Sequence, residues 1–293
     1  MQLLISRKLI ARLGLIICSL VIFLQIINTG ELKAIPPGFK LIKTGIGIEV
    51  YSDLLGDYIQ TVDLTENAEI VFLQGERVGD GVAAAYGGIN PQFQRQSLGE
   101  FWQNLIQRYQ NRAFSICNGQ FFKGGDPTEL AFPVQTEGKI VSTGYAGSEE
   151  FPDEKVVFGV MEKVAEIVPF SENSNFENTN FPYKEAIVGI RKEGAIEPEK
   201  WYSKDPLIER PRTFLGVADR NLDKQNETVL ILTSQGKTQA GAADLLLKFG
   251  ATQVMMLDGG GSTQLNILGE EVLSSTDPVS RTIPQAVGVL QGF

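Results

Sequence analysis

Three consecutive glycines follow an aspartate near the C-terminus, in the segment Asp258-Gly259-Gly260-Gly261-Ser262-Thr263. Glycines cost backbone entropy on folding, and they are justified where the chain turns sharply or a ligand approaches the backbone closely. The exposed N–H groups of such a loop can hold an anion, and the two hydroxyls add donors. Asp258 supplies a carboxylate that can act as acid, base or acceptor for a sugar hydroxyl. Spacing alone leaves a second interpretation open, a flexible turn capped by the aspartate.

Two arginines each precede a hydroxyl residue, in the pairs Arg212-Thr213 and Arg281-Thr282. A guanidinium can donate two parallel hydrogen bonds to a phosphate or a carboxylate, and an adjacent hydroxyl adds a third donor. Each arginine taken singly is equally consistent with a solvated surface charge. The two pairs together predict an anion site.

The composition excludes several other chemistries. Histidine is absent, which removes Ser-His-Asp and Cys-His catalysis and any imidazole base. The net charge of −9 gives no electrostatic reason to bind nucleic acid, whose phosphates require a basic patch. Cys117 is predicted to be a small buried hydrophobe, because no activating base or cation stands beside it in the sequence.

Two similar successions of elements position these residues. An amphipathic helix is predicted from the capping box of Ser97 and Glu100, followed by a buried strand over 113–117 that ends at Asn118. A second helix over 239–249 leads to an apolar strand over 253–257 and then to Asp258. Between them, strands over 213–218 and 228–233 form a predicted hairpin around the turn at 219–221.

This pattern predicts an α/β (α+β) fold, with a mixed β-sheet and flanking helices in one main domain over residues 81–293. A β-rich lead-in over residues 35–80 is expected to pack on that domain. In open α/β sheets, ligands bind beyond the carboxyl ends of the strands. We therefore expect Asn118 and Asp258 to face a common cleft.

The N-terminal segment, residues 1–34, has the pattern of an export signal. Basic residues at 7, 8 and 12 precede an apolar run over 13–27, so the remainder of the chain is expected outside the cytoplasmic membrane. No strong cleavage site follows the run. A cleaved signal peptide and a transmembrane anchor in the cytoplasmic membrane both remain open, and the predicted location is periplasmic or extracellular.

Four motifs in order resemble those of the phosphodiester glycosidase family, which has exported bacterial members. They are Asn118-Gly119-Gln120-Phe121-Phe122, the segment 211–217 that begins Pro211-Arg212-Thr213, the glycine loop preceded by Leu257, and Arg281-Thr282. The likeness covers roughly residues 80–290. It departs from the family at Gln120, where a second glycine is frequent, and at Thr263, where a second serine is common.

The resemblance implies hydrolysis of the bond between the anomeric carbon of an N-acetylglucosamine-like sugar and a phosphodiester, in envelope or exopolysaccharide material. It implies catalytic roles for Asp258, Asn118 and Arg212. Arg212 and Arg281 would hold the phosphate, and Asn118 would orient a hydroxyl or the N-acetyl group. Substrate contacts are expected from the following residues: Gly259, Gly260, Gly261, Ser262, Thr263, Thr213, Arg281, Gln120 and Phe122.

The sequence leaves three points open. A glycosidase commonly uses a second carboxylate, and Asp126, Asp219 and Glu129 all stand near the motifs in sequence. The residues point to no particular cofactor, and the need for a divalent cation, Mg²⁺ or Ca²⁺, stays open because no ligand set at a recognisable spacing is present. The alternative function is a non-catalytic envelope protein that binds sugar or anionic polysaccharide.

Overall fold

The computed structural model describes residues 35–147, 150–151, 154–170, 181–191 and 207–293. The N-terminal segment predicted to direct export therefore lies outside the described residues. Among the residues that are described, no helix is both long and apolar enough to cross a membrane.

The larger of the two main sheets has the strand order β1-β2-β3-β15-β14-β16-β13-β11-β12, with β9 paired to β13 and β10 paired to β9. Every pairing in it is antiparallel. Its strands are β1 (Lys40–Gly45), β2 (Ile48–Ser52), β3 (Asp57–Asp63), β9 (Val134–Thr136), β10 (Lys139–Ser142), β11 (Lys155–Met161), β12 (Val164–Pro169), β13 (Glu185–Arg191), β14 (Arg210–Ala218), β15 (Thr228–Lys237) and β16 (Gln253–Met256).

The second main sheet is five-stranded, antiparallel and ordered β18-β17-β7-β19-β4. Its strands are β4 (Glu69–Gln74), β7 (Ala113–Asn118), β17 (Leu265–Ile267), β18 (Glu270–Leu273) and β19 (Gln285–Leu290). A small third sheet joins β5 (Arg77–Asp80), β6 (Pro91–Phe93) and β8 (Thr128–Glu129). Short 3-10 turns are η1 (Leu64–Glu66), η2 (Gln110–Arg112) and η4 (Gly260–Ser262).

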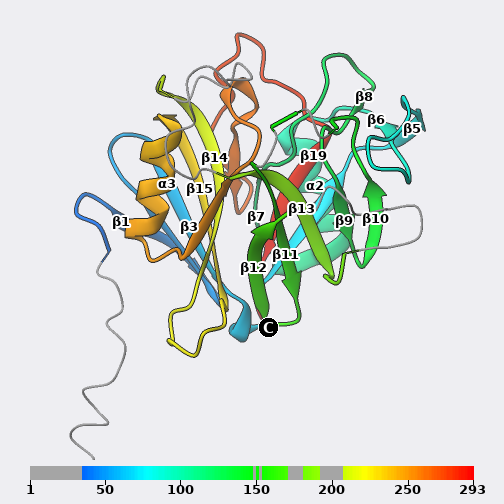
Figure 1. Cartoon of the computed structure of the whole chain (residues 1–293). Coiled ribbons are helices and arrows are strands. Elements are labelled where there is room, and N and C mark those ends of the chain that lie inside the picture. The colour runs from blue at the N-terminus through cyan, green and yellow to red at the C-terminus, as the bar shows by residue number, and fades with distance from the viewer. Residues whose placement is uncertain (1–34, 148–149, 152–153, 171–180, 192–206) are drawn as a thin grey trace, which may run out of the picture.

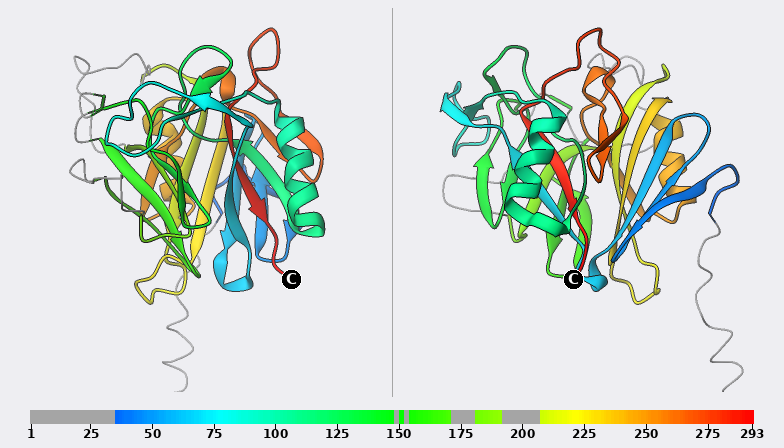
Figure 2. Two further views of the ribbon diagram at one scale, coloured as in Figure 1. Left: turned by 90° about the vertical axis from the view of Figure 1, so that its right-hand side faces the viewer. Right: turned by 180° about the vertical axis from the view of Figure 1, so that it is seen from behind.

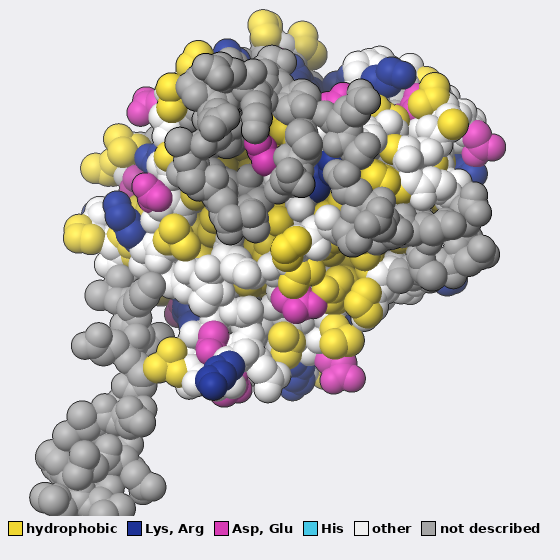
Figure 3. Space-filling view, in the orientation of Figure 1, with side chains coloured by type: hydrophobic (Ala, Val, Ile, Leu, Met, Phe, Trp, Pro, Cys, Tyr) yellow, Lys and Arg dark blue, Asp and Glu magenta, His cyan; other side chains and the backbone are white. Residues whose placement is uncertain are grey.

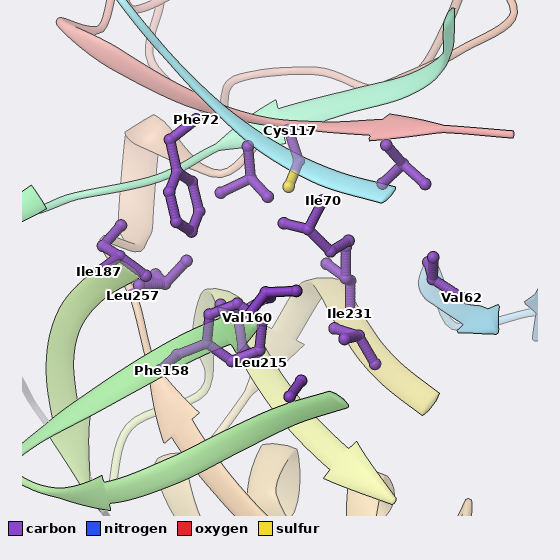
Figure 4. Close-up of a cluster of buried hydrophobic side chains, with 14 of the residues drawn as sticks. Val62, Ile70, Phe72, Cys117, Phe158, Val160, Ile187, Leu215, Ile231 and Leu257 are labelled. Atoms are coloured by element: carbon purple, nitrogen blue, oxygen red, sulfur yellow. The ribbon is translucent and has the colours of Figure 1, made fainter. Parts of the chain in front are cut away.

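The two main sheets pack face to face, and one α-helix covers the outer face of each (Figures 1 and 2). Apolar side chains from both sheets fill the space between them, among them Phe72, Cys117 and Leu215 (Figure 4). Helix α3 (Gln239–Lys248) packs on the larger sheet through Leu246, and helix α2 (Leu98–Tyr109) packs on the smaller sheet through residues such as Phe101.

The predicted α/β fold is wrong. The described residues form mostly antiparallel β-sheet, with two α-helices among them. The strands β7 and β14 are buried on both faces, because the second sheet lies on one side and a helix on the other. Such strands have the continuous apolar sequence that is also typical of parallel α/β sheets. The continuous apolar sequence of these strands was interpreted as a sign of helices on both faces of the sheet. In the structure, a second sheet covers one of the two faces.

Several local predictions are confirmed. Helix α2 begins after Ser97, whose hydroxyl accepts the Glu100 N–H while the Glu100 carboxylate accepts the Ser97 N–H. Strands β14 and β15 form the predicted antiparallel hairpin, and α3 ends before Gly250, which has a φ of +104°. Local signals therefore identified elements correctly, although their assembly differs from the one expected.

Candidate active site

The ends of β7 and β16, which belong to different sheets, meet at one edge of the sandwich. The N–H of Asp258 donates to the Gly119 carbonyl at 3.0 Å, and the N–H of Leu257 donates to the Thr213 carbonyl at 2.9 Å. Asn118 and Asp258 thus lie side by side, and a common cleft that both face stays a prediction. The reason for their proximity differs from the expected one, since the two sheets converge here rather than two parallel strands of one sheet.

Asn118 is 1% exposed and joins three segments of this edge. Its Nδ2 donates to the Asp258 carbonyl at 2.6 Å, and its Oδ1 accepts the Thr213 hydroxyl at 2.7 Å and the Gln264 N–H at 3.4 Å. The side chain therefore holds the glycine loop against the start of β14. A direct contact of Asn118 or Thr213 with substrate stays a prediction.

Each glycine of the loop has a different structural requirement. Gly260 has a φ of +62°, in the left-handed region that favours glycine. A Cβ on Gly259 would lie 2.9 Å from the Pro211 carbonyl, and one on Gly261 would lie 2.2 Å from Oδ1 of Asp277. The loop is consequently clamped between the start of β14 and the segment before β19, which argues against a merely flexible turn.

Two hydroxyls of the loop lack hydrogen-bond partners. Ser262 and Thr263 are both 0% exposed, and neither Oγ of Ser262 nor Oγ1 of Thr263 has a partner among the described residues. A buried hydroxyl without a partner is costly, and such groups are uncommon in native proteins. Both hydroxyl oxygens are buried, so contact of either with a bound ligand stays a prediction.

The two predicted anion-binding arginines lie on either side of the loop. Arg212 is 4% exposed, and its guanidinium donates to the carbonyls of Lys237 and Ile208, each at 3.1 Å. Its Cδ lies 3.9 Å from the position of a Cβ on Gly259. Arg281 has a side chain that is 37% exposed and forms a 2.6 Å ion pair with Asp277. Both positive charges are therefore adjacent to the glycine loop.

Gln120 and Phe122 continue from β7 past the site and have partners within the protein. The Gln120 amide donates to the Val188 carbonyl at 2.7 Å and accepts the Phe121 N–H at 2.8 Å. The ring of Phe122 faces the Arg95 guanidinium at 5.0 Å. Both residues shape the chain around the site, and contact of either with substrate stays a prediction.

Asp277 is a site residue that the sequence analysis missed. Its carboxylate lies against Gly261 and pairs with Arg281, and the neighbouring Ser275 hydroxyl donates to the Gly261 carbonyl at 2.5 Å. The one available signal was an acid four residues before Arg281. Four residues separate neighbours on a helix, but this segment is not helical, so only the fold makes the pairing evident.

Of the three candidates for a second carboxylate, Glu129 is the one that shares an electrostatic neighbour, Tyr145, with Asp258. Desolvation raises the pKa of the Tyr145 phenol above its ordinary value, and the carboxylates of Glu150, Asp258 and Glu129 raise it further. Asp258 and Glu129 therefore both lie within electrostatic reach of that phenol. Glu129 is 4% exposed and has Lys123 Nζ at 3.8 Å.

The other two candidates are placed differently. Asp126 Oδ1 accepts the Arg95 N–H at 2.9 Å in an exposed loop. Asp219 follows the far end of β14, six residues from Thr213, which corresponds to about 20 Å of extended strand. Asp219 therefore lies at the opposite end of the sandwich from Asp258.

Cys117 is not available as a nucleophile. It is 1% exposed, in the core between the sheets (Figure 4), and burial raises the pKa of its thiol to about 12. In a Cys18→Ser variant at pH 8, we expect no reaction of the native protein with a thiol reagent and one reactive thiol per chain in denaturant. Rapid labelling of the native variant would show that this part of the core opens readily.

Charged side chains of both signs are interspersed over the described part of the face shown in Figure 3. No extended basic area is visible among them. The expectation that nucleic acid is not a partner stays a prediction.

The chain belongs to the phosphodiester glycosidase family, whose model matches residues 111–290. The match includes all four motifs quoted above from Asn118 to Thr282. Membership supports a glycosidase, or hydrolase, that acts on phosphodiester-linked sugars in general. A search of curated proteins finds no match.

Two solved structures share the fold. The catalytic domain of zebrafish N-acetylglucosamine-1-phosphodiester α-N-acetylglucosaminidase, auto-inhibited by its pro-peptide, matches with a TM-score of 0.54 and 14% identity, over 91% of this chain and 87% of that one. A hypothetical protein from Synechocystis matches with a TM-score of 0.54 and 13% identity, over 87% of this chain. This chain covers 64% of the Synechocystis chain. At these identities the likeness concerns the fold alone.

Proposed function

We propose that the protein hydrolyses the glycosyl–phosphate bond of a sugar-1-phosphodiester, with an N-acetylglucosamine-like sugar, outside the cytoplasmic membrane. The observation that carries the proposal is the glycine loop, which combines Asp258 with two buried hydroxyls that have no partner. These donors suit the phosphate oxygens, and the missing side chains of the glycines allow a close approach.

The residues around the loop suggest how the work is divided. Arg281 presents an exposed guanidinium edge to the phosphate, while its Nε stays bonded to Asp277. Arg212 contributes positive charge from a buried position. Asp258 and Glu129 are then the two carboxylates that stabilise an oxocarbenium-like transition state and transfer protons. A phosphate leaving group carries its own negative charge, so it requires little help from an acid.

The biological setting belongs to the same proposal. The apolar run over 13–27 suits export and, if retained, anchoring in the cytoplasmic membrane, which would place the site against envelope or exopolysaccharide material. The alternative is a binding protein that uses the same site without turnover. It predicts ligand binding without release of sugar.

The test is to incubate the full chain with UDP-N-acetylglucosamine and with an alkyl N-acetylglucosamine phosphodiester and to measure free sugar. Turnover by the wild type is expected. Arg281→Gln should raise KM by about 10- to 100-fold, because it removes a charge-assisted hydrogen bond to phosphate. Its effect on kcat should be smaller.

An exposed arginine away from the site provides the matched control. Arg77 lies on β5, where its side chain is 54% exposed. Arg77→Gln should leave KM unchanged. Binding of both esters without any release of sugar would support the binding protein instead, and an equal KM for the Arg281→Gln variant would remove that residue from the phosphate site.

A further inference from the structure

Three carboxylates gather in the turn between β14 and β15. One oxygen from each of Asp219, Asp223 and Glu227 lies within 4.8 Å of the other two. None of the ion pairs formed by the described residues involves any of the three. Like charges at this separation repel one another, and none of the described ion pairs offsets that repulsion.

Glu227 is the member of the cluster with the greatest need for a positive partner. It is 7% exposed, and its Oε1 accepts the Arg220 N–H at 2.8 Å. Its Oε2 is buried and has no hydrogen-bond partner among the described residues. A buried carboxylate oxygen is costly unless it is paired or coordinates a metal. The more exposed members of the cluster, Asp219 and Asp223, can remain hydrated, whereas Glu227 cannot.

The turn holds its carboxylates in fixed positions. The Asp219 carboxylate accepts the N–H groups of Asp223 at 3.2 Å and Lys224 at 2.7 Å, and Asp223 accepts the N–H of Gln225 at 2.8 Å. Lys224 has a φ of +75°, a conformation that L residues rarely adopt. The local hydrogen bonds thus determine where the three acidic side chains are presented.

We propose that this turn binds a calcium ion through one carboxylate oxygen each of Asp219, Asp223 and Glu227, with main-chain carbonyls and water as the remaining ligands. Calcium takes six to eight oxygen ligands at about 2.3–2.6 Å, so that two opposite ligands stand about 4.6–5.2 Å apart. The three carboxylate oxygens lie close enough together for one such ion to contact all of them. Magnesium requires ligands at about 2.0–2.1 Å in stricter octahedral geometry and is usually bound through one or two carboxylates, so a group of three carboxylates suits calcium better.

The ion would stabilise the fold rather than take part in the reaction. The turn lies at the lower end of the molecule in Figures 1 and 2, in yellow, whereas η4 of the glycine loop lies at the upper end, in orange. The carbonyl of Glu227 accepts the Leu64 N–H at 2.9 Å, and that of Asn226 accepts the Ala165 N–H at 2.8 Å. A calcium ion here would therefore secure the junction of β15 with η1 and β12.

The inference is independent of the proposed function and is tested by binding. The full chain is treated with a chelator, dialysed and titrated with CaCl₂ in a calorimeter, and its thermal unfolding is followed with and without 1 mM CaCl₂. We expect one calcium ion per chain, a higher Tm with calcium, and a smaller effect of MgCl₂ at the same concentration.

Variants distinguish the turn from general binding to an acidic surface. Asp223→Asn changes an exposed ligand and should weaken calcium binding at least tenfold while the protein stays folded. Asp244→Asn, an exposed acid on α3, should bind as the wild type does. Glu227→Gln should remove the Tm increase. Absence of saturable binding by the wild type, unchanged affinity of Asp223→Asn, or tighter binding of magnesium than calcium would each overturn the proposal.

Discussion

Asp258→Asn is expected to lower kcat for hydrolysis of a sugar phosphodiester by about 10²- to 10⁴-fold, the usual contribution of a positioned acid or base. The substitution keeps the shape of the side chain and removes its charge. The main-chain bonds of Asp258, from its N–H to Gly119 and from Asn118 to its carbonyl, do not involve the carboxylate. We therefore expect the loop to stay in place while proton transfer or charge stabilisation is lost.

The measurement is release of free sugar under saturating substrate, together with thermal unfolding of each protein. Asp244→Asn removes an acid of the same type from the exposed face of α3 and should retain wild-type kcat and Tm. Equal kcat for Asp258→Asn and the wild type would exclude the role given to Asp258. Glu129→Gln tests the second carboxylate in the same assay, with loss of kcat expected.

Asn118→Ala is expected to lower the free energy of unfolding by about 2–5 kcal/mol, because this buried side chain has three hydrogen-bond partners and two of them are buried. The Asp258 carbonyl, the Thr213 hydroxyl and the Gln264 N–H would all lose a bond, and both Thr213 and Gln264 are buried. Activity should fall as well, because Asn118 fixes the glycine loop against β14.

Urea unfolding provides the measurement, and Thr213→Val provides a graded comparison. That variant removes the hydroxyl bonded to Asn118 Oδ1 and should cost about 1 kcal/mol, the net value of one hydrogen bond. If Asn118→Ala lowers the free energy of unfolding by less than about 0.5 kcal/mol, the effect is that of an ordinary surface substitution. That result would contradict the proposal that Asn118 holds the glycine loop against β14. Unchanged stability with lost turnover would favour a direct contact with substrate.

Local sequence patterns were sufficient to predict the helices and strands around the site. The capping box of Ser97 and Glu100 located the start of α2, and the apolar runs located β7, β14 and β16. The order of the four motifs identified the family that the match to residues 111–290 shows. These features depend on neighbours in the chain, so they are legible without the fold.

The arrangement of those elements required the tertiary structure. A strand buried on both faces has the same apolar pattern whether a helix or a second sheet covers it, which is why the α/β expectation failed. Asp277 lies beside Gly261 through a contact between distant segments. Residue types alone also could not reveal that Asp219 belongs to the acidic turn at the other end of the molecule.

The sequence by itself determined the family, the glycine loop and the absence of imidazole chemistry, because each is a property of residue types and their order. Only the tertiary structure decided that Asn118 joins the loop to β14. It also decided that the buried Ser262 and Thr263 hydroxyls and one buried Glu227 oxygen find no partner in the described part of the chain. Burial and hydrogen bonding depend on which segments are in contact, and the packing of the two sheets determines those contacts.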